Sequence, residues 1–222
     1  MKKYAVIVAG GKGLRMGSEL PKQFLLLRGK PLLMHTLAAF YRADASTELL
    51  LVLPVSHRAY WASLCETYGF DVPVRLIDGG ETRFHSVKNG LAAVPEGALV
   101  AIHDGVRPLV STDLICRSFV QAAARGGVIP TTPLIDSIRQ VVADGGSAHV
   151  DRSAYMAVQT PQCFQSTLLK ACYEQPYREA FTDDASVYEA AGHRIYCVPG
   201  ERENIKITTP LDLKIAEIAL EG

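Results

Sequence analysis

The feature that most constrains the fold of this chain is a repeated alternation between short apolar runs and longer amphipathic segments. The short runs are rich in β-branched and aliphatic residues, as expected of strands that are buried on both faces. The longer segments place apolar residues three or four positions apart, which is the spacing of one helix face. We therefore predict strands over 4–9, 49–53, 72–77, 99–102 and 194–198, and helices over 31–42, 56–68, 82–94, 112–124, 165–173, 183–191 and 210–220.

This alternation also predicts how the elements are connected. Strands that alternate with helices are joined by right-handed crossovers, which build a mainly parallel sheet covered on both faces. We therefore predict an α/β fold with a Rossmann-like sheet flanked by helices, formed by a single domain over residues 1–222. In such sheets, ligands bind at the C-terminal ends of the strands. Ser56 is expected to cap the second helix, because serine is a favoured N-cap residue.

The segment 131–158 interrupts the alternation. It contains two β-like runs, 137–142 and 149–158, around the turn sequence Asp144-Gly145-Gly146, which is typical of a hairpin. An isolated two-stranded hairpin is marginal in water unless something packs against it. We therefore expect an inserted β-arm that packs on a partner subunit of a homodimer, and an arm folded back on its own subunit is the alternative. The arm's apolar residues are Ile138, Val141, Val142, Val150 and Met156.

Charge and cysteine content exclude several classes of protein. The 23 basic and 23 acidic residues give a formal net charge of zero, which argues against a protein that coats nucleic acid. The first apolar run is too short for a signal peptide or a membrane span. The five cysteines are odd in number and show no C-x-x-C spacing, so neither a disulfide framework nor a zinc site is indicated. We expect a cytoplasmic protein that does not bind membranes.

The loop after the first predicted strand has the composition of a phosphate site. It reads G-G-K-G-L-R-M-G over 10–17, so backbone N–H groups can approach an anion closely while Lys12 and Arg15 add positive charge. It matches neither the dinucleotide fingerprint nor the Walker loop. Alone, it is equally compatible with an ordinary glycine-rich turn. Lys22, in the sequence P-K-Q, brings a further cation beside the same loop and favours a polyphosphate site.

These motifs resemble those of nucleotidyltransferases, and later segments narrow the resemblance. The later segments are D-G-G-E-T-R at 78–83 followed by S-V at 86–87, H-D-G-V-R-P at 103–108, T-P-Q at 160–162, T-D-D-A-S at 182–186 and N-I-K-I-T at 204–208. Together they resemble the 2-C-methyl-D-erythritol 4-phosphate cytidylyltransferase family. That resemblance implies a fold of the nucleotide-diphospho-sugar transferase type. It also implies transfer of CMP from CTP to 2-C-methyl-D-erythritol 4-phosphate in non-mevalonate isoprenoid precursor synthesis, with Mg²⁺, by a homodimer.

The resemblance assigns the nucleotide site. It implies that Arg15 and Lys22 contact phosphoryl oxygens and that Lys206 reaches the reacting phosphates, so that these three are the catalytic cations. The cytosine and ribose would lie beside Gly80 and Ser86. The resemblance places Gly10, Gly11 and Gly13 along the triphosphate, and it counts Ala9 and Asp104 among the nucleotide-binding residues.

The chain's own pattern adds a metal ligand. Asp104 follows the apolar run 99–102 with one residue between them, so its carboxylate should emerge at the C-terminal end of that strand, where a hard cation such as Mg²⁺ needs oxygen ligands. The alternative is that Asp104 only caps a helix. Glu203 stands where relatives often have aspartate, and we leave it outside the metal set.

The polyol phosphate site is also assigned by resemblance. Arg107, beside Pro108, would bind the substrate phosphate, and Thr160 and Thr182 would surround the polyol. Asp136, Ser137 and Arg152 lie in the arm and would reach the pocket from the partner subunit. Ser137 replaces a threonine found in many members, which keeps the hydroxyl group and loses a methyl group. The six histidines show no H-E-x-x-H spacing, and none is assigned a catalytic role.

Two alternatives remain at this stage. The ribitol 5-phosphate cytidylyltransferases have a closely similar nucleotide half, and only the polyol pocket separates the two families. A nucleotide-binding regulatory domain without catalysis would need the glycine-rich loop but not Asp104, Arg107, Arg152 and Lys206 together.

Overall fold

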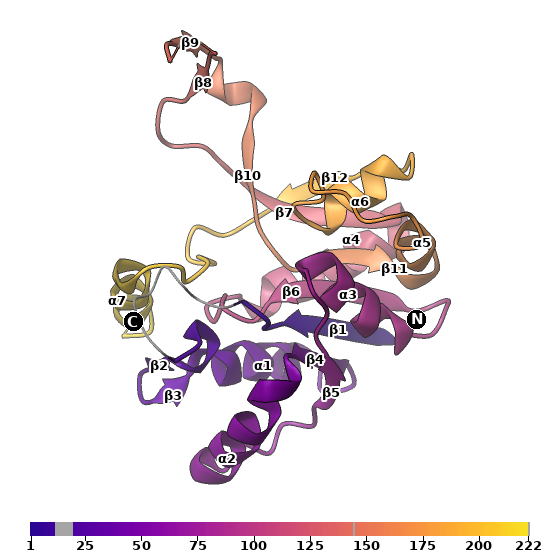
Figure 1. Cartoon of the computed structure of the whole chain (residues 1–222), viewed down its shortest axis with the longest axis vertical. Coiled ribbons are helices and arrows are strands. Elements are labelled where there is room, and N and C mark those ends of the chain that lie inside the picture. The colour runs from indigo at the N-terminus through magenta and orange to yellow at the C-terminus, as the bar shows by residue number, and fades with distance from the viewer. Residues whose placement is uncertain (12–19, 144, 222) are drawn as a thin grey trace.

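The protein is described here by a computed structural model, which covers residues 1–11, 20–143 and 145–221. Within these ranges the chain forms one eight-stranded sheet, in the order β10-β7-β11-β6-β1-β4-β5, with β12 pairing with β7 (Figure 1). The strands are β1 (Lys3–Val8), β4 (Glu48–Leu53), β5 (Arg75–Asp78), β6 (Leu99–Asp104), β7 (Gly127–Pro133), β10 (Met156–Val158), β11 (Gln162–Gln165) and β12 (Tyr196–Pro199).

The sheet is mostly parallel. Strand β1 runs parallel to β4 and β6, β4 runs parallel to β5, and β12 runs parallel to β7. Strand β11 is antiparallel to β6 and β7, and β10 is antiparallel to β7. The predicted α/β class with a mainly parallel sheet is confirmed. The C-terminal ends of β1, β4, β5 and β6 share one edge of the sheet, which is where the predicted phosphate loop begins.

Helices cover both faces of the sheet (Figure 1). On β1, Ala5 and Ile7 pack in one apolar cluster with residues of α1 and α4, while Tyr4 and Val6 pack in a second cluster with residues of α3, α5 and α6. This follows from the two-residue period of a strand that is buried on both faces. The helices are α1 (Leu32–Ala43), α2 (Arg58–Tyr68), α3 (Arg83–Ala92), α4 (Thr112–Arg125), α5 (Ser166–Cys172), α6 (Asp184–Ala190) and α7 (Pro210–Ala219).

Some elements differ from the sequence predictions. The prediction for Ser56 is wrong, because Ser56 lies inside a short 3₁₀ turn, η3 (Val55–His57), and α2 starts after His57 without a side-chain cap. Strand β5 starts at Arg75, three residues later than predicted. The strands β7 and β11 were not predicted.

The predicted hairpin is present at the tip of an arm that projects away from the sheet (Figure 1). It consists of β8 (Arg139–Val141) and β9 (Ser147–His149), which pair antiparallel. The second β-like run is not one strand, because the 3₁₀ turn η4 (Arg152–Ala154) separates β9 from β10, and β10 belongs to the main sheet. Val141 is 82% exposed, so in a single subunit the arm is not folded back over its own apolar residues.

A third apolar cluster packs the segment that follows the phosphate loop against the C-terminal part of the chain. Here the 3₁₀ turn η2 (Lys22–Phe24) leads into the short hairpin β2 (Leu26–Leu27) and β3 (Lys30–Pro31). Leu27 and Leu32 pack there against Ile207 and Ala216, and Ala216 belongs to α7. The C-terminal segment is thereby held beside the start of α1.

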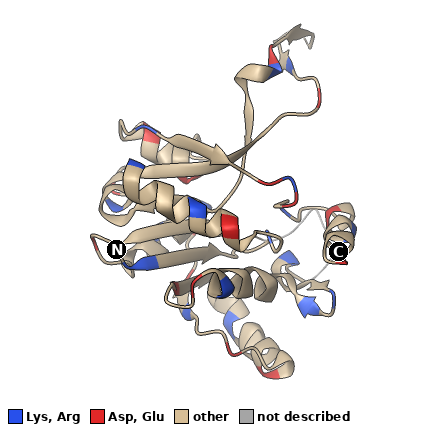
Figure 2. Ribbon diagram, turned by 180° about the vertical axis from the view of Figure 1, so that it is seen from behind, with Lys and Arg blue, Asp and Glu red and all other residues tan. Residues whose placement is uncertain are grey.

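Basic and acidic residues are interspersed along the ribbon, as expected of a chain with no formal net charge (Figure 2). The expectation that this protein does not coat nucleic acid remains a prediction. In the described ranges, every helix is too short or too polar to cross a membrane.

Candidate active site

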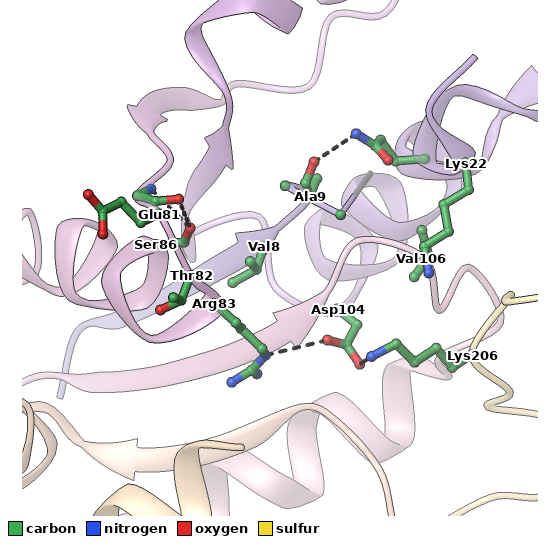
Figure 3. Close-up of a pocket in the computed structure, with 14 residues that line it drawn as sticks. Val8, Ala9, Lys22, Glu81, Thr82, Arg83, Ser86, Asp104, Val106 and Lys206 are labelled. Carbon is green, nitrogen blue, oxygen red and sulfur yellow. Dashed lines mark hydrogen bonds and ion pairs between the residues drawn. The ribbon is translucent and has the colours of Figure 1, made fainter. Parts of the chain in front are cut away.

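A pocket opens at the C-terminal edge of the parallel strands, as predicted for this class of sheet (Figure 3). One wall comes from the end of β1 and the turn η2, a second from the β5–α3 turn, and a third from β6 and the segment before α7. The lining residues are Val8, Ala9, Gly10, Gly11, Lys22, Gln23, Gly80, Glu81, Thr82, Arg83, Ser86, Asp104, Val106 and Lys206.

The first wall contains the described part of the predicted phosphate loop. Buried Gln23 donates a hydrogen bond of 2.8 Å from Nε2 to the backbone carbonyl of Ala9, which ties η2 to the end of β1. This contact brings Lys22 beside Gly11, where an added Cβ would lie 3.7 Å from Lys22 Cε. Gln23 was part of the sequence motif, but the motif gave it no role. The predicted contacts of Gly13 and Arg15 lie outside the described residues.

The second wall brings Gly80 and Ser86 together. The backbone N–H of Gly80 donates to Ser86 Oγ at 3.0 Å. An added Cβ at Gly80 would lie 2.4 Å from His85 Cβ, so this turn has no room for a larger residue. Thr82 caps α3 by accepting a hydrogen bond from the backbone N–H of His85, and this fixes the start of the helix. Both predicted base-site residues therefore face the pocket on a closed turn.

The third wall is centred on Asp104, the last residue of β6. Its Oδ2 lies 3.1 Å from Lys206 Nζ and 3.3 Å from Arg107 Nε, and its Oδ1 lies 3.9 Å from Arg83 Nε. Burial opposes ionisation of this carboxyl group, but the positive charges of Lys206, Arg83 and Arg107 outweigh it and hold the pKa of Asp104 well below its usual value of 3.8. Asp104 is therefore an anion inside a ring of three cations.

Asp104 is not a helix cap. The following helix, α4, is capped by Ser111, whose side chain accepts a hydrogen bond from the backbone N–H of Leu114. The interpretation of Asp104 as an N-cap is therefore wrong for this helix, and its carboxylate is directed into the pocket instead (Figure 3).

The donor set around Asp104 fits only one kind of metal site. Among the described residues, no group of three or more His, Cys, Asp and Glu side chains is placed to hold an ion. Mg²⁺ is commonly held by one or two carboxylates together with substrate phosphates and water. Asp104 Oδ1, which lies 3.9 Å from Arg83 Nε, fits such a site if the phosphates supply further ligands. Glu203 is exposed and lines neither this pocket nor the next one.

A second pocket adjoins the first. Arg83, Asp104 and Lys206 line both pockets. The other residues of the second pocket include three that were predicted to bind the polyol phosphate: Arg107, Thr160 and Thr182. Its remaining lining residues are Val158, Gln159, Gln162 and Asp183.

A buried histidine organises the floor shared by these pockets. His103 Nε2 lies 3.3 Å from the carbonyl oxygen of Arg107, which can only accept, so Nε2 carries the proton. Burial lowers the pKa of His103 to about 3, so the ring is neutral and its Nδ1 accepts a hydrogen bond from Thr160 Oγ1 at 3.0 Å. Thr160 Oγ1 in turn accepts from the backbone N–H of Asp104 at 3.2 Å. The Thr160 hydroxyl proton is thus committed to His103, and a substrate hydroxyl can only donate to this oxygen.

Ser137 and Arg152 lie apart from both pockets. They line a separate hollow on the arm together with Ile138, His149, Val150 and Asp151. Arg152 Nη1 donates there to the backbone carbonyl of Ile135. Asp136 also lies on the arm, outside both pockets. One subunit therefore brings together every described residue of the predicted site except those on its arm.

The fold and the site define a nucleotidyltransferase. Gly10, Gly11 and Lys22 lie at the carboxyl edge of a parallel sheet. The two adjoining pockets share two cations, which are suited to phosphate groups, and a carboxylate between them.

Comparison with known proteins gives the particular family. The model of the 2-C-methyl-D-erythritol 4-phosphate cytidylyltransferase family matches residues 4–222. Proteins of that description from Bacteroides fragilis and Phocaeicola vulgatus are 56% and 54% identical over 220 residues, which is 99% of this chain and 100% of each relative. The chain belongs to this family, and the predicted resemblance is confirmed.

Solved structures agree with this assignment. The crystal structure of 4-diphosphocytidyl-2C-methyl-D-erythritol synthase from Anaerococcus prevotii superposes with a TM-score of 0.83 at 30% identity, covering 99% of this chain and 98% of that chain. The 2-C-methyl-D-erythritol 4-phosphate cytidylyltransferase of Thermus thermophilus gives a TM-score of 0.78 at 31% identity over the full length of both chains.

Proposed function

We propose that this chain transfers CMP from CTP to 2-C-methyl-D-erythritol 4-phosphate, forming CDP-methylerythritol and pyrophosphate. Its membership of the family supports this reaction and a place in non-mevalonate isoprenoid precursor synthesis. The ribitol 5-phosphate alternative is not favoured, because the matching family model and the relatives carry the methylerythritol description. The observation that carries the proposal is the pair of adjoining pockets that share Arg83, Asp104 and Lys206.

In this proposal CTP occupies the first pocket. The backbone of Ala9, Gly10 and Gly11 lies along the triphosphate, Lys22 contacts a phosphoryl oxygen, and the base lies against Gly80 and Ser86. A base next to a closed turn meets backbone groups that cannot move. If these groups pair with the edge of a pyrimidine, a purine leaves them unpaired and binds less well. This placement rests on the lining of the pocket and on the resemblance.

The polyol phosphate occupies the second pocket, with its phosphate between Arg107 and Lys206. A phosphate oxygen of this substrate attacks the α-phosphorus of CTP, a new P–O bond forms, and the bond to the β-phosphate breaks as pyrophosphate leaves. The nucleophile is already ionised near neutral pH, so no general base is required. The cations mainly offset the repulsion between the two anionic substrates and the charge of the five-coordinate phosphorus.

We assign the metal role to Asp104, which would hold Mg²⁺ through Oδ1 together with the phosphates. A bound Mg²⁺ neutralises phosphate charge and helps pyrophosphate to leave. Lys206 and Arg107 on Oδ2 keep the carboxylate ionised and oriented for that task.

We propose that Ser137 and Arg152 contact the substrate in the partner subunit of a homodimer. The exposed apolar residues of the arm include Ile135, Val141 and Met156, which are 61%, 82% and 46% exposed in one subunit. A two-fold pairing would bury them and would bring the arm of one protomer to the second pocket of its partner. A cytoplasmic location, expected from the cysteine pattern, remains a prediction.

Pyrophosphate release by the purified protein tests the reaction. We expect release that requires CTP, Mg²⁺ and methylerythritol phosphate together, and far slower release with ribitol 5-phosphate. Faster turnover of ribitol 5-phosphate would replace the proposed acceptor. No release with either acceptor would support the nucleotide-binding domain without catalysis.

A further inference from the structure

Arg83 is held by the carboxylate of Asp184, a residue that was not among the predicted site residues. Its Nη1 and Nη2 donate to Oδ1 and Oδ2 of Asp184 at 3.1 and 2.6 Å, which is a bidentate ion pair. Asp184 is fully buried, whereas 28% of the Arg83 side chain is exposed. The pair therefore anchors one end of the guanidinium in the interior and leaves the arginine accessible from the pockets that it lines.

Asp184 is itself fixed by two further contacts. The hydroxyl of buried Tyr173 donates to Asp184 Oδ1 at 2.6 Å. The backbone N–H of Asp184 donates to Gln162 Oε1 at 3.0 Å, and the same oxygen accepts from the backbone N–H of Ala185 at 2.9 Å. Gln162 thereby ties the first turn of α6 to β11. Because the carboxylate and its backbone are both held, Asp184 offers Arg83 a rigid partner.

Arg83 has a second carboxylate nearby. Its Nε lies 3.9 Å from Asp104 Oδ1, whereas the ion-pair contacts of Lys206 and Arg107 are to Oδ2 (Figure 3). Without Asp184, the guanidinium would lose both of its short contacts, and among the described residues Asp104 would be the nearest anion. An arginine that turned onto Asp104 would withdraw its charge from the boundary between the two pockets and would occupy the oxygen assigned to the metal.

We infer that Asp184 is a positioning residue for the transfer reaction, which it serves by holding Arg83 at the boundary between the nucleotide and polyol phosphate pockets. This inference rests on the proposed function, because it places one phosphate in each pocket. In this arrangement Arg83 presents a fixed positive charge where the two anionic substrates meet, and such a charge lowers the barrier most when it does not have to reorient. Asp184 touches neither substrate and acts only through Arg83.

A double-mutant cycle tests this inference in the full-length enzyme. The variants are Asp184→Asn, Arg83→Met and the double variant, and kcat and KM are measured for both substrates together with the thermal midpoint. We expect each single substitution to lower kcat/KM about tenfold or more, and we expect the double variant to be no slower than Arg83→Met. Lost packing would lower the thermal midpoint but would not produce this coupling.

Glu174→Gln is the matched control, since it also neutralises a carboxylate paired with a cation of α3. Glu174 lies 3.2 Å from Lys88 on the surface, away from both pockets, and we expect its kcat/KM to stay within about twofold of the wild type. If Asp184→Asn does not fold, Tyr173→Phe removes the hydroxyl that fixes Asp184 and keeps the ion pair. It should lower kcat/KM in the wild-type background but not in the Arg83→Met background.

The outcomes separate this inference from the proposed function. A wild-type protein that releases no pyrophosphate would overturn the proposed function and the inference with it. An active wild type in which the effects of Asp184→Asn and Arg83→Met multiply would overturn the positioning role alone. The same holds if Asp184→Asn retains kcat/KM within about twofold of the wild type.

Discussion

The side-chain amide of Gln23 donates to the backbone carbonyl of Ala9 at 2.8 Å, and this hydrogen bond joins the turn that carries Lys22 to the end of the first strand. The carbonyl belongs to the segment where the phosphate loop begins. The position of the lysine beside the proposed triphosphate site therefore depends in part on a buried amide.

Lys22→Ala should lower kcat about a hundredfold or more while the circular dichroism spectrum stays unchanged. The reason is that a charge-assisted contact to a phosphoryl oxygen strengthens as the phosphorus gains a fifth ligand. Lys30→Ala, on the exposed side of the short hairpin β2–β3, is the control and should keep normal kcat. Near-normal turnover of Lys22→Ala would remove this residue from the catalytic set.

Gly80→Ala should raise the KM for CTP about tenfold or more and lower the free energy of unfolding by about 1–3 kcal/mol. The new methyl group would lie 2.4 Å from His85 Cβ and 2.9 Å from the His85 carbonyl carbon, so the β5–α3 turn must move. Gly79→Ala is the matched control, because its methyl group would meet its nearest neighbours at 3.4 Å. Equal KM values for the two variants would argue against the base site on this turn.

CTP should be used in strong preference to GTP and ATP, with kcat/KM about a hundredfold higher or more. A site shaped to pair with one base leaves buried hydrogen-bonding groups unpaired with another. Pyrophosphate release measured with each nucleoside triphosphate in turn gives the separate kcat/KM values and hence their ratio. Similar kcat/KM values for CTP and GTP would contradict the assignment of Gly80 and Ser86 to the cytosine.

Mixed dimers should reveal whether the arms are exchanged between subunits. Arg152→Ala and Lys22→Ala are each expected to be nearly inactive alone. If Arg152 serves the partner's pocket, a heterodimer has one site with both residues intact, and an equilibrated equal mixture should regain roughly a quarter of wild-type activity. Confirmed subunit exchange without any regained activity would mean that Arg152 serves its own chain.

The neutral, buried state of His103 predicts a stability that falls on acidification. Its pKa is about 3 in the folded protein against an ordinary value of 6.5, so below pH 6.5 the unfolded chain binds a proton that the folded chain does not. The contribution of His103 to stability is therefore complete above pH 6.5 and is lost as the pH falls toward 3, by about 1.4 kcal/mol per pH unit.

Urea titrations at pH 6.5, 6.0, 5.5 and 5.0 measure this slope. His103→Gln should show a shallower slope than the wild type by about that amount, whereas His149→Gln, on the exposed strand β9, should leave the slope unchanged. Equal slopes for the wild type and His103→Gln would contradict the buried neutral histidine.

Local patterns in the sequence determined much of the architecture. Helix α4 was predicted to start at Thr112 and α7 at Pro210, and both do so because their caps, Ser111 and Thr209, are local signals. The parallel strands β1, β4 and β6 could be predicted from the sequence, because a continuous apolar run of this kind is typical of a strand that is covered on both faces. The ordered motifs indicated the family, since they extend over nearly the whole chain.

Tertiary structure alone decided the remainder. Strand β7 contains glycine and prolines and resembles a loop in sequence, and it is a strand because β10, β11 and β12 pair with it. The contacts that build the site join residues far apart in the chain, such as Arg83 with Asp184, which are separated by 101 positions. Periodicity and capping report on neighbours along the chain, whereas an ion pair or a buried hydrogen bond depends on which distant side chains the folded sheet brings within 3 Å.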